Sequence, residues 1–554
     1  MANPTRLTQD MIDGYIDRGY WDKLSISDIL RRNAERSPDK EVLVDSDTRL
    51  TWAELENRTN NVAVGLLKLG MKRDQAIVAQ LPSSVTSLLL LLACHKAGIL
   101  CCFSPMTFRY NELKHIVKTT KAVAVLTPTE YRGVNYFNMV REIARDVPEL
   151  NIFLVTDNDV PQGALSFRSL YEGPFKTDSY QKYLQRKAFS PFEVSAFALS
   201  SGTTGMPKCI EHTGASFKSA GWGVAQRAKL TEDDVIGNIA PLSGGPGLQN
   251  WWSAFQVGAK TCLLEHFTPD KALELIQKER VSYLSAIPTQ LIRMLKESNL
   301  DRYDLSTLRV IRTGAAAFDA YLAAETEQRF RCKVLIAGGS METFSFAQSG
   351  VDDPREKRLR TLGKPFPGNE IKIVDDDGRE VSVGQIGQLL VRGAATSSGY
   401  YGDLDATLAA WGTIGNKGWF KTGDLAKIDE QGYVAIVGRK KQMIIRGGQN
   451  IYPGEIEDLL VSHPKLMQAV IIGIPDLVMG ERVCVCVTPV PGQGLTLEEI
   501  TSFLREKGLA IHKLPERLEV LEQFPTLVDG QKVDKISLTK KIIEKVMAEG
   551  EDNV

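Results

Sequence analysis

Apolar segments typical alternately of a strand and of a helix recur along the first two-thirds of the chain. Between residues 75 and 126 the expected order is strand, helix, strand, helix, strand, at 75–81, 83–97, 99–103, 109–121 and 123–126. The alternation returns beyond residue 259, with strands at 260–264, 283–287 and 308–312 and a helix at 269–279. Two strands joined by a helix of this length run parallel in one sheet, with the helix against a face of that sheet. The sequence therefore predicts an α/β fold of parallel-type sheets with flanking helices.

Length and composition narrow the class of protein. With 554 residues the chain is too long for one ordinary core, so two or more domains are expected. A formal net charge of −1 provides no overall field that would hold nucleic acid or an anionic membrane. The longest apolar run, 88–94, is too short to cross a bilayer, and residues 1–6 lead into polar residues instead of a signal core. We therefore expect a cytoplasmic protein without a nucleic-acid or membrane partner.

The cysteines and histidines give no sign of a metal site or of a disulfide framework. The eight cysteines lack paired CxxC spacing, and the six histidines are scattered. Cys101, Cys102, Cys484 and Cys486 lie in apolar stretches that are typical of buried strands, where cysteine behaves as a small hydrophobic residue. This pattern also favours a reducing cytoplasm.

The organisation of the chain changes twice after residue 369. Short strands around the turn at 375–378 predict a small β module within the large domain. Beyond residue 441 a compact α+β unit is expected, with strands at 468–473, 483–488 and 517–521 and helices beginning after Thr496 and at Ile536. We therefore divide the chain into a large N-terminal domain, 1–437, a hinge, 438–441, and a small C-terminal domain, 442–554.

A stretch rich in glycine and hydroxyl groups, 200–208, follows the apolar segment 194–199. Two glycines, two serines, two threonines and a lysine fall within its nine residues. Glycine lets the backbone approach an anion closely, amides and hydroxyls can surround its oxygens, and Lys208 adds a positive charge. The stretch differs from a Walker-type loop because Pro207 precedes the lysine and Cys209 follows it. A phosphate-binding loop is the favoured interpretation, and an ordinary Ser/Gly surface turn is the alternative.

Four further stretches carry residues that suit nucleotide chemistry. Glu342 lies in an expected loop, 338–343, after an expected strand, where a carboxylate suits Mg²⁺. Asp424 follows two aromatic residues and could accept hydrogen bonds from a ribose. Arg439 lies in the hinge, and Lys532 lies in a glycine-containing loop before the last helix. Taken alone, each is also explained as a solvated side chain or as part of a turn.

In their order and spacing, these five stretches resemble the adenylate-forming superfamily of acyl- and aryl-CoA synthetases, peptide-synthetase adenylation domains and luciferases. The resemblance extends from 50–55 to Lys532 and includes 387–400 and 433–439. The motif Gly-Gly-Gln-Asn-Ile-Tyr-Pro at 447–453 is most similar to that of AMP-forming acid–CoA ligases. The resemblance implies a large α/β domain and a small mobile domain that turns about Lys441.

The resemblance also implies a reaction in two halves. A substrate carboxylate attacks the α-phosphate of ATP in the presence of Mg²⁺, which gives an acyl-adenylate and pyrophosphate. The thiol of coenzyme A then attacks the activated carbonyl and releases AMP. ATP, Mg²⁺ and coenzyme A are therefore the expected cofactors, and a small-molecule carboxylic acid is the expected substrate.

The same resemblance assigns roles to residues of this chain. Lys532 would bridge the carboxylate and the α-phosphate. Thr203 and Lys208 would hold the other phosphates, and Thr204 and Glu342 would place Mg²⁺. The implied nucleotide-binding set is Ser200, Ser201, Gly202, Thr203, Thr204, Gly205, Lys208, Gly314, Ala315, Gly338, Gly339, Ser340, Met341, Glu342, Asp424, Val437, Arg439 and Lys532.

Two further binding sites are implied. Gly447 and Gly448 would let the pantetheine arm of coenzyme A pass. The acid pocket would be lined by Gly244, Gly245, Ala316 and Gly338. Many relatives carry a histidine in the first of these loops, and glycines there leave room and remove a polar partner. A bulky, mostly apolar acid is therefore expected, of the aromatic, alicyclic or medium-chain kind.

Two departures from the family pattern concern the nucleotide site. Gly338 stands four residues before Glu342, where relatives carry an aromatic residue that stacks on adenine, and Phe344 is the candidate replacement for that ring. Met341 stands in place of a common threonine. In the catalytic loop, Lys535 is the alternative to Lys532.

Two other functions stay open. A stand-alone adenylation enzyme would load an acyl or aryl carrier protein instead of coenzyme A. A degenerate relative would bind nucleotide or acyl-CoA as a sensor. The oligomeric state, monomer or homodimer, is also open.

Overall fold

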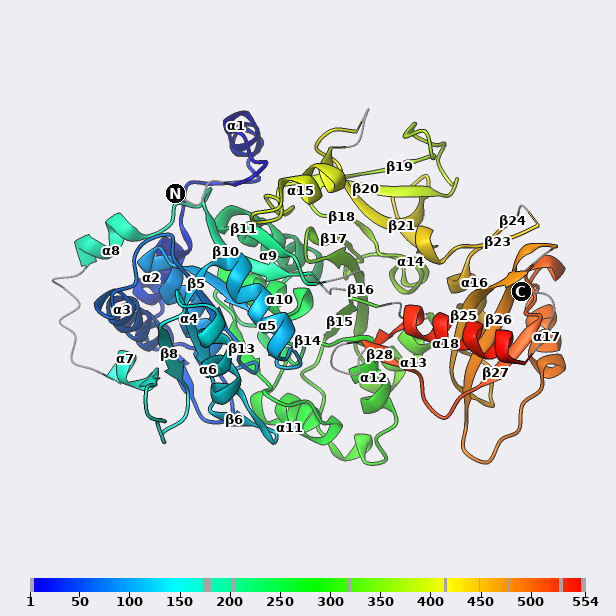
Figure 1. Ribbon diagram of the computed structural model, residues 1–554, viewed down its shortest axis with the longest axis horizontal. Coiled ribbons are helices and arrows are strands. Elements are labelled where there is room, and N and C mark those ends of the chain that lie inside the picture. The colour runs from blue at the N-terminus through cyan, green and yellow to red at the C-terminus, as the bar shows by residue number, and fades with distance from the viewer. Residues whose placement is uncertain are drawn as a thin grey trace.

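The computed structural model describes residues 4–172, 181–200, 206–316, 318, 320–412, 416–447, 449–476, 478–527 and 532–549 (Figure 1). For Gln181, Lys441, Leu527 and Lys532 the description covers the backbone alone. Most of the chain forms a large unit, and the C-terminal residues form a smaller unit at one end of it (Figure 1).

The larger of the two main sheets has the strand order β18-β17-β16-β15-β14-β12-β13-β1-β2. Its strands are β1 (Glu41–Val44), β2 (Arg49–Thr51), β12 (Val235–Asn238), β13 (Lys260–Leu263), β14 (Tyr283–Ser285), β15 (Val310–Gly314), β16 (Lys333–Ser340), β17 (Phe344–Gln348) and β18 (Lys364–Pro365). The strands from β16 to β1 run parallel, whereas β2, β17 and β18 pair antiparallel at the two edges. Parallel strands need crossover connections, and helices supply most of them.

The second main sheet has the order β11-β10-β4-β3-β5-β8-β9. Its strands are β3 (Ala76–Ala79), β4 (Leu100–Phe103), β5 (Ala122–Thr127), β8 (Ile152–Val155), β9 (Leu165–Ser166), β10 (Val194–Leu199) and β11 (Cys209–Thr213). All neighbours are parallel except β10 and β11, which form an antiparallel pair at one edge. The phosphate-loop stretch joins β10 to β11, which is the edge strand.

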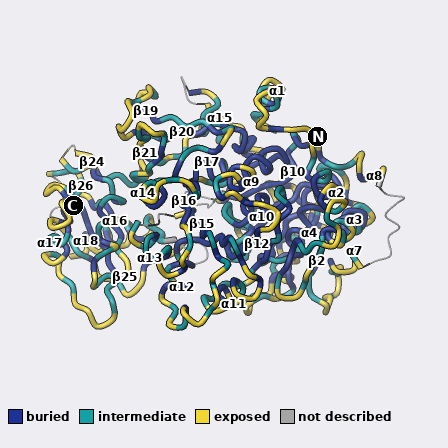
Figure 2. Tube along the Cα trace, turned by 180° about the vertical axis from the view of Figure 1, so that it is seen from behind, coloured by how far each residue is buried: buried dark blue, intermediate teal, exposed yellow. Residues whose placement is uncertain are grey.

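Four helices fill the space between the two sheets. They are α3 (Trp52–Lys68), α4 (Val85–Ala97), α9 (Gly214–Ala228) and α10 (Gly245–Val257). One core cluster joins Leu90 of α4 and Trp252 of α10 to Ile77 of β3 and Leu43 of β1. A helix that is apolar all round must be buried on every side. Accordingly α4 lies in the interior, where the tube is dark in Figure 2.

Further helices cover the outer faces of both sheets. α5 (Tyr110–Thr120) and α6 (Tyr136–Asp146) pack on the sheet that contains β3, and α11 (Pro269–Glu279), α12 (Pro288–Leu295) and α13 (Ala320–Phe330) pack on the sheet that contains β15. The large unit therefore has five layers, helix, sheet, helix, sheet, helix.

An antiparallel module and the small unit complete the molecule. The module contains β19 (Asn369–Val374), β20 (Gly387–Gly393), β21 (Phe420–Ile428) and β22 (Val434–Arg439), with α15 (Leu404–Trp411) beside it. The small unit contains β23 (Ile444–Arg446), β24 (Gln449–Ile451), β25 (Leu466–Asp476), β26 (Gly480–Pro489), β27 (Arg517–Val520), α16 (Pro453–Leu460), α17 (Leu497–Glu506), α18 (Lys535–Ala548), η3 (Lys440–Gln442), η4 (Ile511–Lys513) and the pair β28 (Thr526–Leu527) and β29 (Lys532–Val533). Apolar clusters lie on both faces of its sheet, one against α16 and α17 and one against α18.

The remaining described elements are short or peripheral. They are α1 (Gln9–Asp17), α2 (Ile26–Arg36), α7 (Arg168–Glu172), α8 (Gln181–Lys187), α14 (Arg355–Arg360), β6 (Glu130–Tyr131), β7 (Val134–Asn135) and η2 (Leu300–Arg302). Among the described residues we find no helix with the length and apolarity to span a membrane.

The α/β class, the parallel-type sheets, the β module and the α+β unit are confirmed. The four strand cysteines are buried as expected, and no cysteine is in a disulfide. The loop expected at 338–343 is wrong in its first half, because β16 continues to Ser340 and only 341–343 form the turn into β17. A Cβ atom at Gly339 would lie 1.8 Å from the carbonyl oxygen of Phe344, so this tight hairpin admits only glycine there.

Candidate active site

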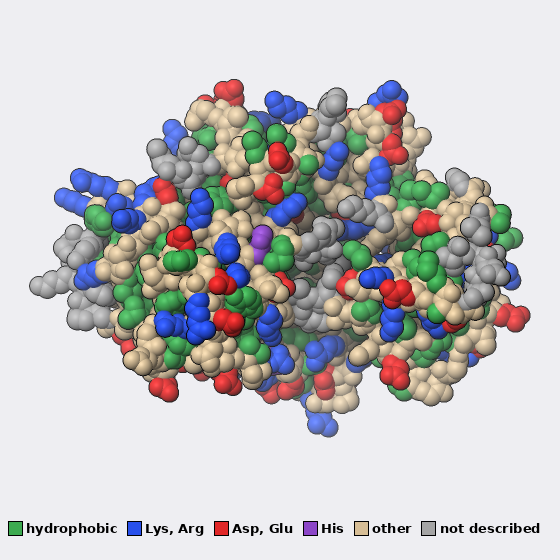
Figure 3. Space-filling model, viewed as in Figure 1, with side chains coloured by type: hydrophobic (Ala, Val, Ile, Leu, Met, Phe, Trp, Pro, Cys, Tyr) green, Lys and Arg blue, Asp and Glu red, His purple; other side chains and the backbone are tan. Residues whose placement is uncertain are grey.

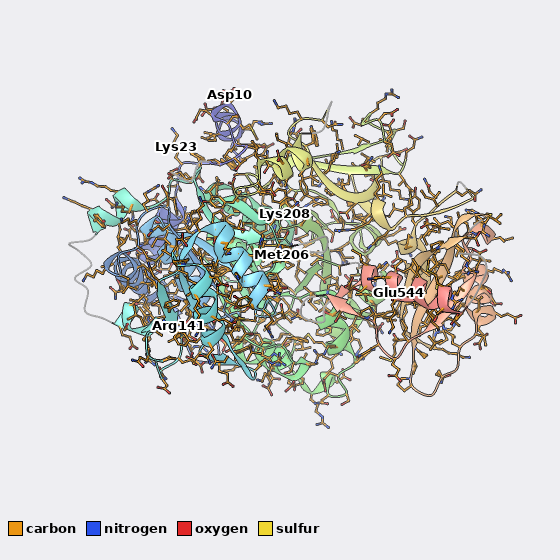
Figure 4. All side chains as sticks on the ribbon, in the orientation of Figure 1. Asp10, Lys23, Arg141, Met206, Lys208 and Glu544 are labelled. Atoms are coloured by element: carbon orange, nitrogen blue, oxygen red, sulfur yellow. The ribbon has the colours of Figure 1, made fainter. Side chains whose placement is uncertain are left out.

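The phosphate-loop stretch is closed at its base by the β10–β11 pair. Leu199 faces Cys209 in that pair. The backbone N–H of Ser200 donates to the carbonyl oxygen of Lys208 at 3.0 Å, and the N–H of Lys208 donates to the Ser200 hydroxyl at 2.9 Å. The Lys208 side chain is exposed at this edge (Figure 4). The expected phosphate-binding residues Ser201, Gly202, Thr203, Thr204 and Gly205 lie outside the described residues.

A segment that carries Tyr400 pairs with the free edge of β11. The N–H of Glu211 donates to the carbonyl of Gly399, and the N–H of Tyr401 donates to the carbonyl of Cys209. These bonds place Tyr400 beside the phosphate-loop lysine, whose Nζ lies 4.8 Å from the centre of the tyrosine ring. A cation over an aromatic face is attracted by the negative charge of that face.

The same tyrosine contacts the carboxylate expected to hold Mg²⁺. The Tyr400 hydroxyl donates to Oε1 of Glu342 at 2.9 Å, and the N–H of Ser397 donates to the Glu342 carbonyl at 2.7 Å. Burial, and secondly the Glu342 charge, raise the pKa of the Tyr400 phenol, so it remains a donor at neutral pH. Lys208, Tyr400 and Glu342 form what we call the Tyr400 cluster.

Tyr400 is the residue that sequence reasoning missed. Its Gly-Tyr pair matches a family motif, but a role for the hydroxyl depends on Glu342, which is 58 residues away in the chain. Glu342 offers hard oxygen ligands on a partly exposed turn, and Mg²⁺ is commonly held by one or two carboxylates plus phosphate oxygens and water. The Glu342 carboxylate is therefore a suitable ligand for the expected Mg²⁺. Among the described residues, no group of three or more His, Cys, Asp or Glu side chains could hold a metal ion.

The turn that carries Glu342 is supported from below by His212 of β11. Its Nε2 lies 2.9 Å from the Met341 carbonyl oxygen, so the Nε2–H donates a hydrogen bond to it, and the centre of its ring lies 4.5 Å from that of Phe344. Burial lowers the pKa of His212 to about 4. Phe344 is only 2% exposed and also packs on Phe217, so its ring belongs to the core and is not available to stack on adenine.

The missing aromatic residue at position 338 has a structural counterpart. A Cβ atom at Gly338 would lie 2.2 Å from Cδ1 of Leu362. The space that an aromatic side chain would enter is therefore filled by Leu362. This side chain is partly buried and brings an apolar surface to the glycine.

The loop that follows β15 begins in a strained conformation. Ala315 has a φ of 71°, which costs a residue with a Cβ atom on the order of 1 kcal/mol. A Cβ atom at Gly314 would lie 2.6 Å from the Ala337 carbonyl, so glycine is required there. Ala315 and Ala316 are both exposed at the carboxyl end of the sheet, the end at which α/β proteins bind ligands.

Two of the four expected acid-pocket residues begin α10. Gly244 is the N-cap of the helix and Gly245 is its first residue. A Cβ atom at Gly245 would lie 3.2 Å from the sulfur of Met341. The start of α10 thus adjoins the Glu342 turn, and Gly338 and Ala316 lie at the ends of the neighbouring strands β16 and β15.

Two of the expected nucleotide-binding residues, Asp424 and Arg439, also lie together. Asp424 of β21 is opposite Arg439 of β22, and Nε of the arginine lies 2.9 Å from Oδ1 of the aspartate. Val437 is on the same strand as Arg439. A carboxylate can accept from a diol and a guanidinium can donate to it.

Of the expected residues in the small unit, the structure describes few side chains. Gly447 has a φ of 57° and its N–H donates to the Met479 carbonyl at 2.7 Å. Gly448 lies outside the described residues. The backbone of Lys532 pairs with that of Leu527 in the β28–β29 ladder. Lys535 is engaged elsewhere, with its Nζ 2.7 Å from Oε1 of Glu457.

The surface shows no single-signed charge field on the face that carries the phosphate-loop edge. Among the described residues on that face, acidic and basic side chains are interspersed (Figure 3). This agrees with the formal net charge of −1.

Comparison with known proteins gives consistent matches over almost the whole chain. A family model described as AMP-binding enzyme matches residues 30–401, and one described as AMP-binding enzyme C-terminal domain matches 455–530. The 2-hydroxy-7-methoxy-5-methyl-1-naphthoate–CoA ligase of Streptomyces carzinostaticus is 31% identical over 539 residues, which cover 96% of this chain and 95% of the relative. The 2,3-dihydroxybenzoate-AMP ligase of Bacillus subtilis (strain 168) is 29% identical over 545 residues, 97% of either chain. Among solved structures, ATP-bound MatB from Rhodopseudomonas palustris has a TM-score of 0.82 at 25% identity, covering 94% of this chain and 100% of that one.

Proposed function

The chain belongs to the family of AMP-binding enzymes, and from this we propose that it is an acid–thiol ligase. It activates a carboxylic acid with ATP as an acyl-adenylate and then transfers the acyl group to coenzyme A. The observation that carries the proposal is the Tyr400 cluster, in which a lysine from the phosphate-loop stretch and a carboxylate meet at one tyrosine.

The first step joins two anions, so their repulsion must be offset. Lys208 and the hydroxyl and amide groups of 200–205 hold the β- and γ-phosphates. Glu342 and Thr204 would hold Mg²⁺, which would supply the neutralisation of phosphate charge that the in-line displacement needs. The Tyr400 hydroxyl fixes one oxygen of Glu342 and leaves the other for the metal. Asp424 accepts hydrogen bonds from the ribose hydroxyls, and Arg439 donates hydrogen bonds to them.

The second step requires the small unit to move. We propose a large domain, 1–437, a hinge at 438–441 that turns about Lys441, and a small domain, 442–554. In one arrangement Lys532 bridges the carboxylate and the α-phosphate. In the other, Gly447 and Gly448 line the path of the coenzyme A thiol, which attacks the activated carbonyl.

We propose an aromatic, alicyclic or medium-chain acid as the substrate. The printed names of two relatives refer to aromatic acids, a naphthoate and a dihydroxybenzoate. The glycines that begin α10 place no side chain of their own beside Met341, whose sulfur would lie 3.2 Å from a Cβ atom at Gly245. The free and largely buried cysteines favour a reducing cytoplasm for this chemistry.

The acceptor thiol belongs either to coenzyme A or to a carrier protein. The relative from Bacillus subtilis is named as an AMP ligase and not as a CoA ligase. Transfer to the thiol of a carrier protein is therefore the second candidate function.

Incubation with ATP, Mg²⁺, coenzyme A and a panel of acids tests the proposal. We expect acid-dependent release of AMP and pyrophosphate together with an acyl-CoA product. Pyrophosphate release that yields thioester only when a carrier protein is added supports the second candidate. Nucleotide binding without acid-dependent pyrophosphate release, for every acid in the panel, would show a sensor and overturn the proposal.

A further inference from the structure

Arg312 lies in the interior of the large unit, on β15. Its side chain is among the largest that are fully buried, with 2% of the residue exposed. Nε donates to Oε1 of Gln348 at 2.7 Å, and Nη2 donates to Oε1 of Gln249 at 2.9 Å and to the Ser345 hydroxyl at 2.5 Å. All three acceptors are neutral.

The other buried cations of the described chain differ from Arg312 in this respect. Lys96 pairs with Glu56, Lys218 with Asp22, and Arg358 with Glu327. Arg312 has no carboxylate partner among the described residues, and its Nη1 makes no hydrogen bond with them. Burial lowers the pKa of the guanidinium, yet arginine keeps its proton in proteins. A buried charge without a counter-charge is costly, which is why such groups are normally paired.

The position of the guanidinium relative to the expected acid site follows from the sheet register. Gly314 is opposite Ala337, and Ala337 is opposite Gln348, so Gln348 lies level with the end of β15. Ser345, opposite Gly339, lies further towards the carboxyl edge. The Arg312 side chain reaches both of these residues of β17.

The remaining partner comes from the start of α10. Gln249 is one turn into the helix that begins at Gly245. The guanidinium therefore lies between the sheet and the first turns of α10, on the same face of the sheet as Gly314. Gly245 belongs to the expected acid pocket and Gly314 ends β15 on the side of Arg312, and neither supplies a side chain that would separate Arg312 from a bound acid.

We propose that Arg312 is a specificity residue at the inner end of the acid pocket, and that the substrate carries a second anionic oxygen group besides the carboxylate that reacts. This inference rests on the proposed function and names its substrate class. The planar guanidinium fork binds two oxygens of one carboxylate or sulfonate side by side. Gln249, Gln348 and Ser345 hold the fork in place before the acid arrives. The bound anion supplies the counter-charge that the described residues do not provide.

Matched acids test the proposal directly. Benzoate is compared with isophthalate and with 3-sulfobenzoate, and hexanoate with adipate, by pyrophosphate release in the wild-type enzyme. We expect kcat/KM to be about 10- to 100-fold higher for the acid with the second anion, the discrimination that a buried charged group gives. The sulfonate arm separates recognition of any anionic oxygen group from activation of either of two carboxylates.

Two variants and one control locate the effect. Arg312→Gln and Arg312→Met should bring the ratio of kcat/KM between the acid with the second anion and its unsubstituted counterpart close to one. Arg309 precedes the same strand and pairs with Asp234 at 2.8 Å. Arg309→Met should lower stability and leave the ratio unchanged.

Binding of the acids alone provides a measurement that needs no turnover. In thermal shift without ATP, isophthalate should stabilise the wild type more than benzoate does, and Arg312→Gln should remove the difference. A wild type that prefers the unsubstituted acids, or a ratio that persists in Arg312→Gln, overturns the inference and leaves the ligase proposal standing. The ligase proposal fails separately if no acid gives pyrophosphate.

Discussion

At the scale of single residues, Tyr400 contacts two groups of opposite charge, the cation of Lys208 and the carboxylate of Glu342. Its ring faces the cation of Lys208 and its hydroxyl donates to the carboxylate of Glu342. The hydroxyl keeps one carboxylate oxygen occupied, so the other oxygen is held in a fixed orientation for the proposed Mg²⁺. A tyrosine can perform both tasks, whereas phenylalanine can perform only the first.

Tyr400→Phe should therefore retain the contact with the lysine and lose the orientation of Glu342. We expect kcat/KM for adenylation to fall about 10-fold, the effect of losing a hydrogen bond to a charged group, and the Mg²⁺ requirement to rise. Pyrophosphate release measured over a Mg²⁺ titration checks both effects. Tyr401→Phe is the control, because the Tyr401 ring packs on Phe197 instead. Equal Mg²⁺ curves for wild type and Tyr400→Phe would contradict this role.

A side chain at Gly338 would compete with Leu362 for the same space, so the effects of substituting them should depend on each other. Since a Cβ atom at Gly338 would lie 2.2 Å from Leu362, Gly338→Phe alone overpacks the site and should cost about 1–3 kcal/mol of stability. With Leu362→Ala added, stability should recover and the KM for ATP should fall about 2- to 10-fold through aromatic stacking. Melting temperature and ATP kinetics of the single and double variants test this. Tighter ATP binding by the single variant, without a loss of stability, would show that Leu362 does not fill the space.

At the scale of elements, the β16–β17 hairpin depends on a buried histidine of another sheet. His212 lies under the turn and donates to the Met341 carbonyl. Burial lowers its pKa to about 4, whereas an unfolded chain has a histidine pKa of about 6.5. Between these values the unfolded chain binds the proton and the folded protein does not. The free energy of unfolding therefore falls as the pH drops from 6.5 to 4, and the loss is complete below 4.

His212→Gln keeps a donor for the Met341 carbonyl and removes the titration. We expect the melting temperature of this variant to decline less than that of the wild type between pH 6.5 and pH 4.5. His95, also buried and with its pKa lowered to about 3, should keep part of the decline in both proteins. His512→Gln, at an exposed position of η4, should follow the wild type. Parallel curves for wild type and His212→Gln would contradict the account.

The sequence pattern predicted individual elements better than their assembly. The capping box of Thr51 and Glu54 begins α3, and the apolar run at 88–94 lies within the buried helix α4, because both signals are local. The stacking of two sheets around four helices has no local signal. Gly338 and Gly339 have low strand propensity, and they extend β16 only because β17 pairs with them.

In the candidate site too, the sequence reveals the residues that belong to local motifs but not those whose role depends on distant segments. Lys208 and Glu342 carry chemistry that a sequence motif reveals. The role of Tyr400 depends on its pairing with β11, and Arg312 stands in an apolar strand without any local pattern that marks it. Both depend on contacts between segments far apart in the chain.

At the scale of the whole molecule, a single stretch of chain connects the two units, and α16 of the small unit also lies against β22 of the large one. Beyond β22 the chain passes through η3 into β23, and Lys440 contacts Asp376 at 2.7 Å across exposed surface. Such an exposed pair contributes at most about 1 kcal/mol, so it does not lock the two units in one arrangement. The geometry is compatible with the proposed rotation about Lys441.

Lys441→Pro should restrict that rotation, because proline fixes φ near −65°. If the units are held in the arrangement that serves adenylation, pyrophosphate release should stay close to the wild-type rate while thioester formation falls. Lys440→Ala, which removes the exposed pair, is the control and should change neither rate by more than about two-fold. The two half-reactions are followed separately, by pyrophosphate and by acyl-CoA. Unchanged thioester formation in Lys441→Pro would argue against a hinge at this residue.

The central claim is that the phosphate-loop edge of the large unit and Lys532 of the small unit act on one nucleotide. Acid-dependent exchange of pyrophosphate into ATP measures that joint action most directly. We predict that Lys532→Ala lowers exchange about 10²- to 10³-fold, the effect of removing one group that stabilises transition-state charge. The variant should still form thioester from a supplied acyl-adenylate, and Lys535→Ala, which removes the contact with Glu457, should keep its exchange. Exchange at the wild-type rate in Lys532→Ala would contradict the claim.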